Sequence, residues 1–331
     1  MDRGLTAQTK ALLINIGSAD IDTSLLPESM KTTATAGPGA GGTSFFLRSG
    51  SHRVRLSIKK DSPLTVVPWR NGVAIKKEGQ ILAYGQLELP LCHCPEQAYI
   101  TVSERCIFDC KFCPVPILHG KVKTIDEITA MVKAAEARGD LRAISLTSGV
   151  AESPEKEAAY MTRIVRHLSD RFAYPIGVSI YPTATSTRDL RGAGAAEIKY
   201  NVETMDRTIF SGVCPGLSLD DILAALREAV EVFGKNHVSS NFILGLGETD
   251  ECVSDGVEVL AGMGVIPNLR PISPHPLRKG EIAVERPSSY RLIKLARINR
   301  AAIERHGLDV RAAQTMCLPC TGCDLTPQRD L

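Results

Sequence analysis

The stretch Val102-Ser-Glu-Arg-Cys106-Ile-Phe-Asp-Cys110-Lys-Phe-Cys113-Pro-Val-Pro116 decides how this chain is interpreted, because it places three cysteines on one short segment. Their spacing is Cys-x3-Cys-x2-Cys. Three thiolates at this spacing can hold three corners of an iron–sulfur cubane, which leaves the fourth iron without a protein ligand. The alternative is a zinc site, which usually takes four ligands. Cys110 and Cys113 would then form one pair, with His93 or His119 recruited.

The cysteine segment follows the first of several short apolar runs that alternate with longer helical patterns. Regular alternation of this kind predicts a parallel sheet with right-handed crossovers. We therefore expect an α/β fold, a partial (β/α)6 TIM-like barrel over residues 91–312. The predicted strands are 98–102, 143–147, 176–180, 197–201, 238–244 and 265–271, and the predicted helices are 125–138, 154–171, 219–233 and 251–263.

Residues 1–90 differ in character, since they are rich in turn residues and carry short segments that alternate apolar and polar side chains. Segments 43–47, 54–58 and 64–67 predict small β-hairpins and thus a β-rich N-terminal extension. The glycine-rich stretch 37–42 is interpreted as a structural loop, with a lid over the substrate as the alternative. Downstream, we expect a helix over 287–306, a last short strand over 308–311 and a cysteine-rich tail over 313–331.

Composition narrows the class of protein. The 39 basic and 37 acidic residues nearly balance, and aromatic residues make up only 5%, so no nucleic-acid partner is expected. No apolar run approaches the roughly 20 residues that a membrane-spanning helix needs. We therefore expect no membrane partner and a cytoplasmic location.

The ten cysteines are unevenly distributed, with eight of them in three tight groups. Such clustering favours metal or iron–sulfur ligation over structural disulfides. The tail segment carries Cys317, Cys320 and Cys323 at Cys-x2-Cys-x2-Cys spacing, and Cys92 or Cys94 could supply a fourth ligand. We expect an auxiliary [4Fe–4S] cluster there, with a zinc ribbon-like closure as the alternative. The isolated Cys214 and Cys252 are interpreted as ordinary residues.

The cysteine spacing, with the aromatic Phe112 inside it, resembles the radical S-adenosylmethionine (SAM) superfamily over about residues 97–312. The resemblance implies a [4Fe–4S] cluster on Cys106, Cys110 and Cys113 that cleaves SAM, and an external reductant such as ferredoxin or flavodoxin. Chemistry of this kind is carried by the cofactor, so no side chain is expected to be catalytic. The residues that the resemblance assigns to SAM are Thr147, Ser148 and Gly149 for the amino group, Asn201 and Glu203 for the ribose, and Gly245 and Gly247 beside the adenine. Arg270 and Arg278 follow the sixth predicted strand, where barrel loops meet the substrate and the SAM carboxylate. We expect Arg270 to bind a carboxylate, with a solvated basic loop as the alternative.

Within the superfamily, the chain looks most like the biotin synthase-related proteins. Ser239 stands where biotin synthases carry a cluster cysteine, and the N-terminal cysteine motif of lipoyl synthases is absent. Some biotin synthase-related proteins act as two-protein lipoyl synthases. The resemblance therefore implies sulfur insertion into an octanoyl chain, with a second radical SAM protein and an octanoylated carrier protein as partners. The alternatives are a maturase in another cofactor pathway and a non-catalytic zinc or iron–sulfur scaffold.

Overall fold

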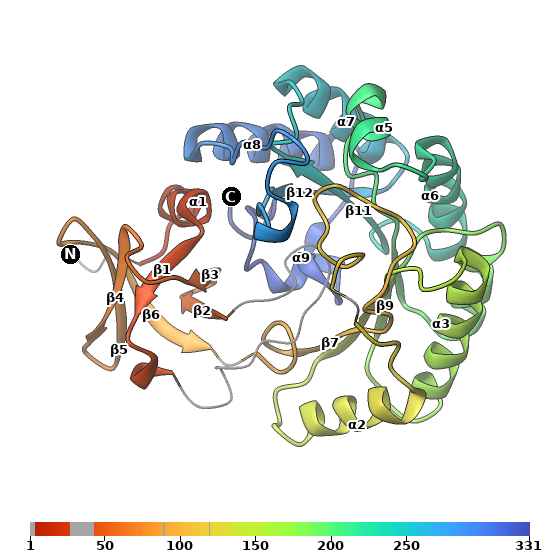
Figure 1. Cartoon of the computed structure of the whole chain (residues 1–331), viewed down its shortest axis with the longest axis horizontal. Coiled ribbons are helices and arrows are strands. Elements are labelled where there is room, and N and C mark those ends of the chain that lie inside the picture. The colour runs from red at the N-terminus through yellow and green to blue at the C-terminus, as the bar shows by residue number, and fades with distance from the viewer. Residues whose placement is uncertain (1–3, 27–42, 89, 119) are drawn as a thin grey trace.

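The computed structural model describes residues 4–26, 43–88, 90–118 and 120–331. The glycine-rich stretch 37–42 and His119 lie outside these residues. The described chain forms two β-structures with the C-terminal segment between them (Figure 1).

The N-terminal part is a closed barrel with the strand order β1-β3-β2-β6-β5-β4. Two antiparallel hairpins, β2–β3 and β4–β5, confirm the hairpins predicted from the alternating segments. Closure depends on β1, which pairs in parallel with both β3 and β4. The elements of this part are α1 (Ala7–Ile16), β1 (Ser18–Ile21), η1 (Thr23–Leu25), β2 (Ser44–Ser49), β3 (His52–Ile58), β4 (Leu64–Trp69), β5 (Gly72–Lys77) and β6 (Gln80–Glu88).

The second part is a six-stranded parallel sheet in which neighbours along the chain are neighbours in space, from β7 at one edge to β12 at the other. All five residues of β7 are buried, as expected where helices or other segments cover both faces of a parallel sheet. The predicted α/β alternation is confirmed. The strands are β7 (Gln97–Thr101), β8 (Ala143–Thr147), β9 (Ile176–Ser179), β10 (Glu197–Lys199), β11 (Val238–Leu244) and β12 (Ile266–Pro271).

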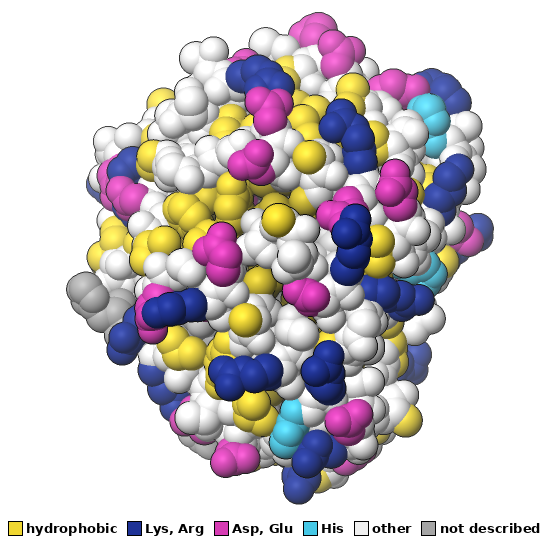
Figure 2. Space-filling view, turned by 90° about the vertical axis from the view of Figure 1, so that its right-hand side faces the viewer, with side chains coloured by type: hydrophobic (Ala, Val, Ile, Leu, Met, Phe, Trp, Pro, Cys, Tyr) yellow, Lys and Arg dark blue, Asp and Glu magenta, His cyan; other side chains and the backbone are white. Residues whose placement is uncertain are grey.

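Helices cover the outer side of this sheet, at the right of Figure 1. Their starts follow the sequence signals: Thr124 and Glu127 form a capping box, and Ser218 caps the helix whose first turn carries Asp220 and Asp221. On the face shown in Figure 2, basic and acidic side chains are interspersed. The helices are α2 (Ile125–Glu136), α3 (Pro154–Ser169), α4 (Ser186–Gly192), α5 (Arg207–Val213), α6 (Leu219–Phe233), α7 (Asp250–Gly262) and α8 (Ser289–Arg305).

The segment after α8 corrects one prediction. Residues 308–311 were expected to form a strand, but the chain forms a 3-10 helix, η5 (Val310–Ala312). The Asp309 side chain accepts a hydrogen bond from the backbone N–H of Arg311 at 2.9 Å, and such local bonds compete with strand pairing. The helix predicted over 287–306 is confirmed as α8, and Ser288 caps it by accepting from the N–H of Arg291.

The C-terminal tail joins the two β-structures. The backbone N–H of Arg55 on β3 donates to the carbonyl of Gly322 at 2.7 Å, and Lys10 on α1 donates to the carbonyl of Thr321 at 2.5 Å. The helix α9 (Cys317–Cys320) therefore lies between the N-terminal barrel and the parallel sheet (Figure 1). Among the described residues, no helix is long and apolar enough to span a bilayer.

Candidate iron–sulfur and SAM site

The cysteine loop after β7 is held by the loop after β8. The thiol of Cys106 accepts a hydrogen bond from the N–H of Val150 at 3.4 Å, and the N–H of Ile107 donates to the carbonyl of Val150 at 2.7 Å. Gly149 makes this approach possible, because a Cβ there would lie 2.1 Å from the carbonyl oxygen of Arg105. The structure therefore places Gly149 against the cluster loop, as the support of its backbone.

The same loop is held from the other side by Arg278, at the end of η4 (Pro276–Arg278). Its Nε donates to the carbonyl oxygen of Cys113 at 2.7 Å, and its Nη atoms contact Asp109 at 2.7 Å and Glu281 at 2.8 Å. Only 5% of the Arg278 side chain is exposed. Sequence reasoning placed this arginine near substrate or the SAM carboxylate, whereas the structure has it fixing the shape of the cysteine loop.

The three thiols of this loop fit an iron–sulfur cluster in their chemistry. Burial raises the pKa of Cys106, and it raises that of Cys113 to about 12. Iron binding must therefore displace protons, as thiolate ligation always does. Among the described residues, no three His, Cys, Asp or Glu side chains surround one position for a single ion. The thiolates of a cubane each bind a different iron and need no such common point.

Cys214 is one of the site residues that the sequence did not predict, and Lys199 is another. Cys214 follows α5, is buried, and its thiol hydrogen-bonds to that of Cys110. This contact and burial raise the pKa of Cys214, so the thiol stays protonated and can donate to a thiolate at position 110. Nothing in its spacing signals the contact, because 104 residues separate the two cysteines and only the fold brings them together.

One face of the parallel sheet carries a cavity of about 610 Å³. Thr147, Ser179 and Lys199 lie in register across β8, β9 and β10 and line it. Asn201 and Glu203 follow β10 and line the cavity near the carboxyl end of that strand, where ligands bind in folds of this type. The cavity thus contains Thr147, Asn201 and Glu203, three of the residues predicted to contact SAM.

Glu203 is electrostatically distinctive. Burial raises its pKa to about 7, against the opposing effects of Lys199, a hydrogen bond from Asn201 and the charge of Arg270. Its backbone has a φ of +59°, a conformation that non-glycine residues seldom adopt. The carbonyl of Glu203 accepts from the N–H of Ile243 at 2.7 Å, so pairing with β11 holds this unusual backbone in place.

Arg270 lines the cavity as well, whereas the other four predicted SAM contacts make different interactions. The Ser148 hydroxyl donates to buried Glu157 and accepts from the N–H of Ser103 at 2.9 Å. In the turn after β11, the Glu248 carboxylate accepts from the N–H groups of Gly245 and Leu246. The described residues that line the cavity do not include Ser148, Gly149, Gly245 or Gly247. These four support the loops around the cavity.

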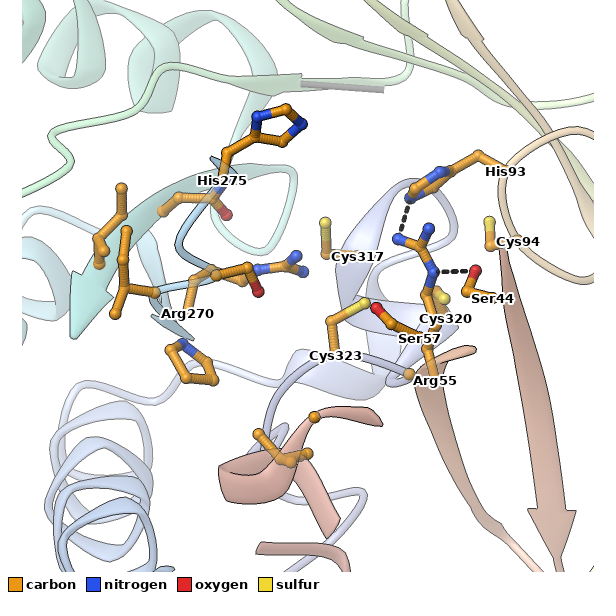
Figure 3. Close-up of a pocket in the computed structure, with 18 of the residues that line it drawn as sticks. Ser44, Arg55, Ser57, His93, Cys94, Arg270, His275, Cys317, Cys320 and Cys323 are labelled. Atoms are coloured by element: carbon orange, nitrogen blue, oxygen red, sulfur yellow. Dashed lines mark hydrogen bonds between the residues drawn. The ribbon is translucent and has the colours of Figure 1, made fainter. Parts of the chain in front are cut away.

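The tail cysteines reach the same cavity from the opposite side (Figure 3). Cys94, Cys317, Cys320 and Cys323 all line it. The thiol of Cys94 hydrogen-bonds to that of Cys320, which together with Arg53 lowers the pKa of Cys320 to about 7. Cys92 has different neighbours: Arg138 and Lys123 are the charges that act on its thiol. The structure therefore brings Cys94 to the tail cysteines, whereas Cys92 is not among the described residues that line the cavity.

The tail reaches this position by crossing the inner face of the sheet. The carboxylate of Glu197 on β10 accepts from the N–H groups of Gln314 and Thr315, and Gln97 on β7 accepts from the N–H of Met316 at 2.7 Å. Gly177 on β9 lies beneath the tail, and a Cβ there would be 2.0 Å from the Thr315 hydroxyl. Arg270 also belongs to this end of the cavity, because it pairs with Asp324 at 3.2 Å.

Comparison with known proteins agrees with this arrangement. The family model of the radical SAM superfamily matches residues 100–260, which include the cysteine loop, Asn201 and Glu203. This part of the chain is a radical SAM domain. The superfamily uses a [4Fe–4S] cluster and SAM. No match is found among curated protein sequences.

Solved structures show the same fold at low sequence identity. A methylornithine synthase is 19% identical with a TM-score of 0.51, over 62% of this chain and 62% of that protein. The [FeFe]-hydrogenase maturase HydG from Carboxydothermus hydrogenoformans is 18% identical with a TM-score of 0.52, over 63% of this chain and 52% of that protein. The match thus spans less than two thirds of either protein, and it concerns the fold alone.

Proposed function

We propose that this radical SAM enzyme generates its radical at Cys106, Cys110 and Cys113 and uses it on a substrate held beside a second iron–sulfur cluster at the tail cysteines. The observation that carries the proposal is a single cavity of about 610 Å³ lined by Asn201 and Glu203 and by four cysteines. When bound, the first cluster supplies the electron that cleaves SAM into methionine and the 5′-deoxyadenosyl radical.

The chain's own residues position and enclose the reactants. Asn201 and Glu203 present an amide and a carboxylate to the ribose hydroxyls, which can donate to one and accept from the other. Arg278 and Val150 fix the cysteine loop from two sides. Thr43, Ser44 and Ser57 of the N-terminal barrel line the cavity opposite the sheet. The barrel thereby keeps water from the reacting carbon, a condition for controlled radical chemistry.

For the reaction itself, the leading candidate is sulfur insertion into an octanoyl chain. Its support is the resemblance to biotin synthase-related proteins, together with a second cysteine set that opens into the same cavity. A cluster there could supply sulfur directly to a carbon radical. The expected partners are a ferredoxin or flavodoxin, a second radical SAM protein and an octanoylated carrier protein.

The second candidate is a maturase whose auxiliary cluster relays electrons. The specific observation in its favour is that four cysteines, rather than three, line the tail end of the cavity. Four thiolates give each iron of a cubane a protein ligand, which favours a cluster that stays intact through turnover.

Anaerobic reconstitution with iron and sulfide tests the proposal. We expect about eight irons per chain, SAM cleavage to 5′-deoxyadenosine under reduction, and loss of that cleavage in Cys110→Ala. An octanoyl-lysine peptide then separates the candidates: a thiolated product supports sulfur insertion, and unchanged peptide with active SAM cleavage supports the maturase. Absence of SAM cleavage in fully loaded protein contradicts the proposed activity and favours a scaffold.

A further inference from the structure

Among the described residues, five cationic side chains lie around the tail cysteines, and three of them already face carboxylates. Arg53 is one of the three, because it acts on Cys320 and pairs with Glu88 and Glu96. Arg270 pairs with Asp324 at 3.2 Å. Lys199 lies 3.8 Å from the Cys317 sulfur and also acts on the Glu203 carboxylate. Figure 3 shows Arg270 reaching toward Cys317 from one side of the cavity and Arg55 standing on the other, with Cys323 between them.

Arg55 enters from the N-terminal barrel, on β3. Its Nε donates to the Ser44 hydroxyl at 2.7 Å, and its Nη1 lies 3.5 Å from the His93 ring nitrogen. Its charge acts on the thiol of Cys323. The neighbouring Arg53, on the same strand, pairs with both Glu88 and Glu96, whereas the partners of Arg55 among the described residues are uncharged oxygens and the histidine.

Arg286 enters from the segment before α8. Its guanidinium packs against Gly17, where a Cβ would lie 2.2 Å from Nη1, so the side chain is held in one position. Its Nε is buried and has no hydrogen-bond partner among the described residues. The charged group that acts on it is the thiol of Cys323. A buried guanidinium with an unsatisfied N–H group destabilises the fold unless an anion lies close to it.

The charges balance if that anion is a cluster. A [4Fe–4S] core in its oxidised form with four thiolates carries a net charge of about −2. Of the cations around the tail cysteines, Arg55 and Arg286 are the two that have no carboxylate partner among the described residues. We propose that Arg55 and Arg286 are the counter-charges of a second cluster on Cys94, Cys317, Cys320 and Cys323, and that they make this cluster easier to reduce. The inference rests on the proposed function, since it requires the second cluster.

The radical SAM cysteines have a different electrostatic setting. The charged groups that act on Cys106 and Cys113 are the neighbouring thiols and the acids Glu157 and Glu203. Negative neighbours disfavour the added electron, and positive ones favour it. We therefore expect the second cluster to have the higher reduction potential of the two, so that it can accept an electron from a substrate radical in the cavity.

An EPR-monitored redox titration tests the inference. The background is the full chain with Cys106→Ala, Cys110→Ala and Cys113→Ala, which leaves the second cluster as the one reducible centre. In this background, Arg286→Gln and Arg55→Gln should each lower the midpoint potential, by about 59 mV if the reduction equilibrium changes tenfold. Arg286→Lys should retain most of the potential because it keeps the charge. Arg48→Gln, on the exposed side of the same barrel, should leave it unchanged.

Iron content separates the possible failures. Wild-type protein with about four irons contradicts the second cluster and the inference together. Wild-type protein with about eight irons, whose Gln variants keep their iron and titrate at the unaltered potential, overturns the counter-charges alone. If Arg286→Gln fails to retain iron, Arg286→Lys and Arg55→Gln decide: retained iron with a lowered potential in Arg55→Gln supports the inference, and an unchanged potential overturns it.

Discussion

Arg278 donates from Nε to the backbone carbonyl oxygen of Cys113 at 2.7 Å, although 165 positions separate the two residues. The bond links the loop after the last strand of the sheet to the loop after the first. Because Arg278 also contacts Asp109 and Glu281, its guanidinium helps to shape the loop that carries the three cysteines. A charged group thus contributes to the site through the backbone of a ligand residue.

Replacement of Arg278 should therefore impair cluster loading. Arg278→Ala leaves the Cys113 carbonyl without its donor and leaves Asp109 and Glu281 with Lys111 as their cation, at a cost of about 1–3 kcal/mol in the loop. We expect reduced iron content at the radical SAM site and little SAM cleavage, with the tail cluster retained. Iron analysis and EPR measure this. Arg305→Ala, on the exposed end of α8, is the control, and equal iron in both variants would contradict the role of Arg278.

Gly149 provides a second test of the same loop. Gly149→Ala places a methyl group 2.1 Å from the Arg105 carbonyl, so the cysteine loop must move away from Val150. We expect loss of SAM cleavage and an altered EPR signal of the SAM-bound cluster. Gly212→Ala, within α5, meets no atom within 4 Å and should behave as wild type. Normal SAM cleavage in Gly149→Ala would show that the close approach is not required.

Much of the radical SAM domain could be predicted from the sequence because its signals are local. The limits of β8, β11 and α6 coincide with the apolar runs and helical periodicity that predicted them. The cysteine spacing likewise lies within a single loop. Short helices with seven residues, α4 and α5, were missed, since so few turns give little periodicity.

Relationships across the chain could not be predicted in this way. Closure of the N-terminal barrel depends on β1, a strand of four residues, which is too short to show a clear alternation of apolar and polar side chains. The contact of Cys214 with Cys110 and the place of Arg286 against Gly17 arise from packing between segments that are distant in sequence. The choice between Cys92 and Cys94 could not be predicted either, because it depends on the course of the segment between β6 and β7.

That choice can be tested directly. Cys94→Ser should lower the iron content from about eight to about four per chain, because it removes a ligand that lies against Cys320. Cys92→Ser should retain the wild-type content, since Cys92 is not among the described residues that line the cavity. Equal iron loss in the two variants, measured after anaerobic reconstitution, would contradict the ligand set proposed for the second cluster.

The raised pKa of Glu203 predicts a pH-dependent affinity for SAM. With a pKa of about 7, the Glu203 carboxylate, which we propose accepts from the ribose hydroxyls, is ionised at pH 8.5 and mostly protonated at pH 6. Affinity should fall about tenfold between these values, following the ionised fraction. Glu203→Gln should bind SAM weakly at both pH values, without the slope. Equilibrium dialysis checks this, and a variant that keeps the wild-type slope would exclude Glu203 as its source.

The buried pair of Lys10 and Asp330 should decide whether the tail stays against the N-terminal barrel. Their side chains are 0% and 1% exposed, and Lys10 Nζ lies 2.6 Å from an Asp330 oxygen that also accepts from the N–H of Thr326. Lys10→Met removes one charge and leaves the buried Asp330 carboxylate unpaired. This should lower the free energy of unfolding of the apoprotein, measured by chemical denaturation, by about 3–5 kcal/mol.

The matched control is Lys156→Met in α3, whose partner Glu152 is exposed in the loop before that helix. This variant should change stability by less than about 1 kcal/mol. Burial raises the pKa of Asp330, so without Lys10 the carboxyl should take up a proton as the pH falls and part of the loss should be recovered at low pH. The double variant Lys10→Met with Asp330→Asn should be more stable than Lys10→Met alone at pH 8. If Lys10→Met and the double variant both have the same free energy of unfolding as wild type, the tail is held by its backbone contacts to Arg55 and the sheet, and the ion pair is dispensable.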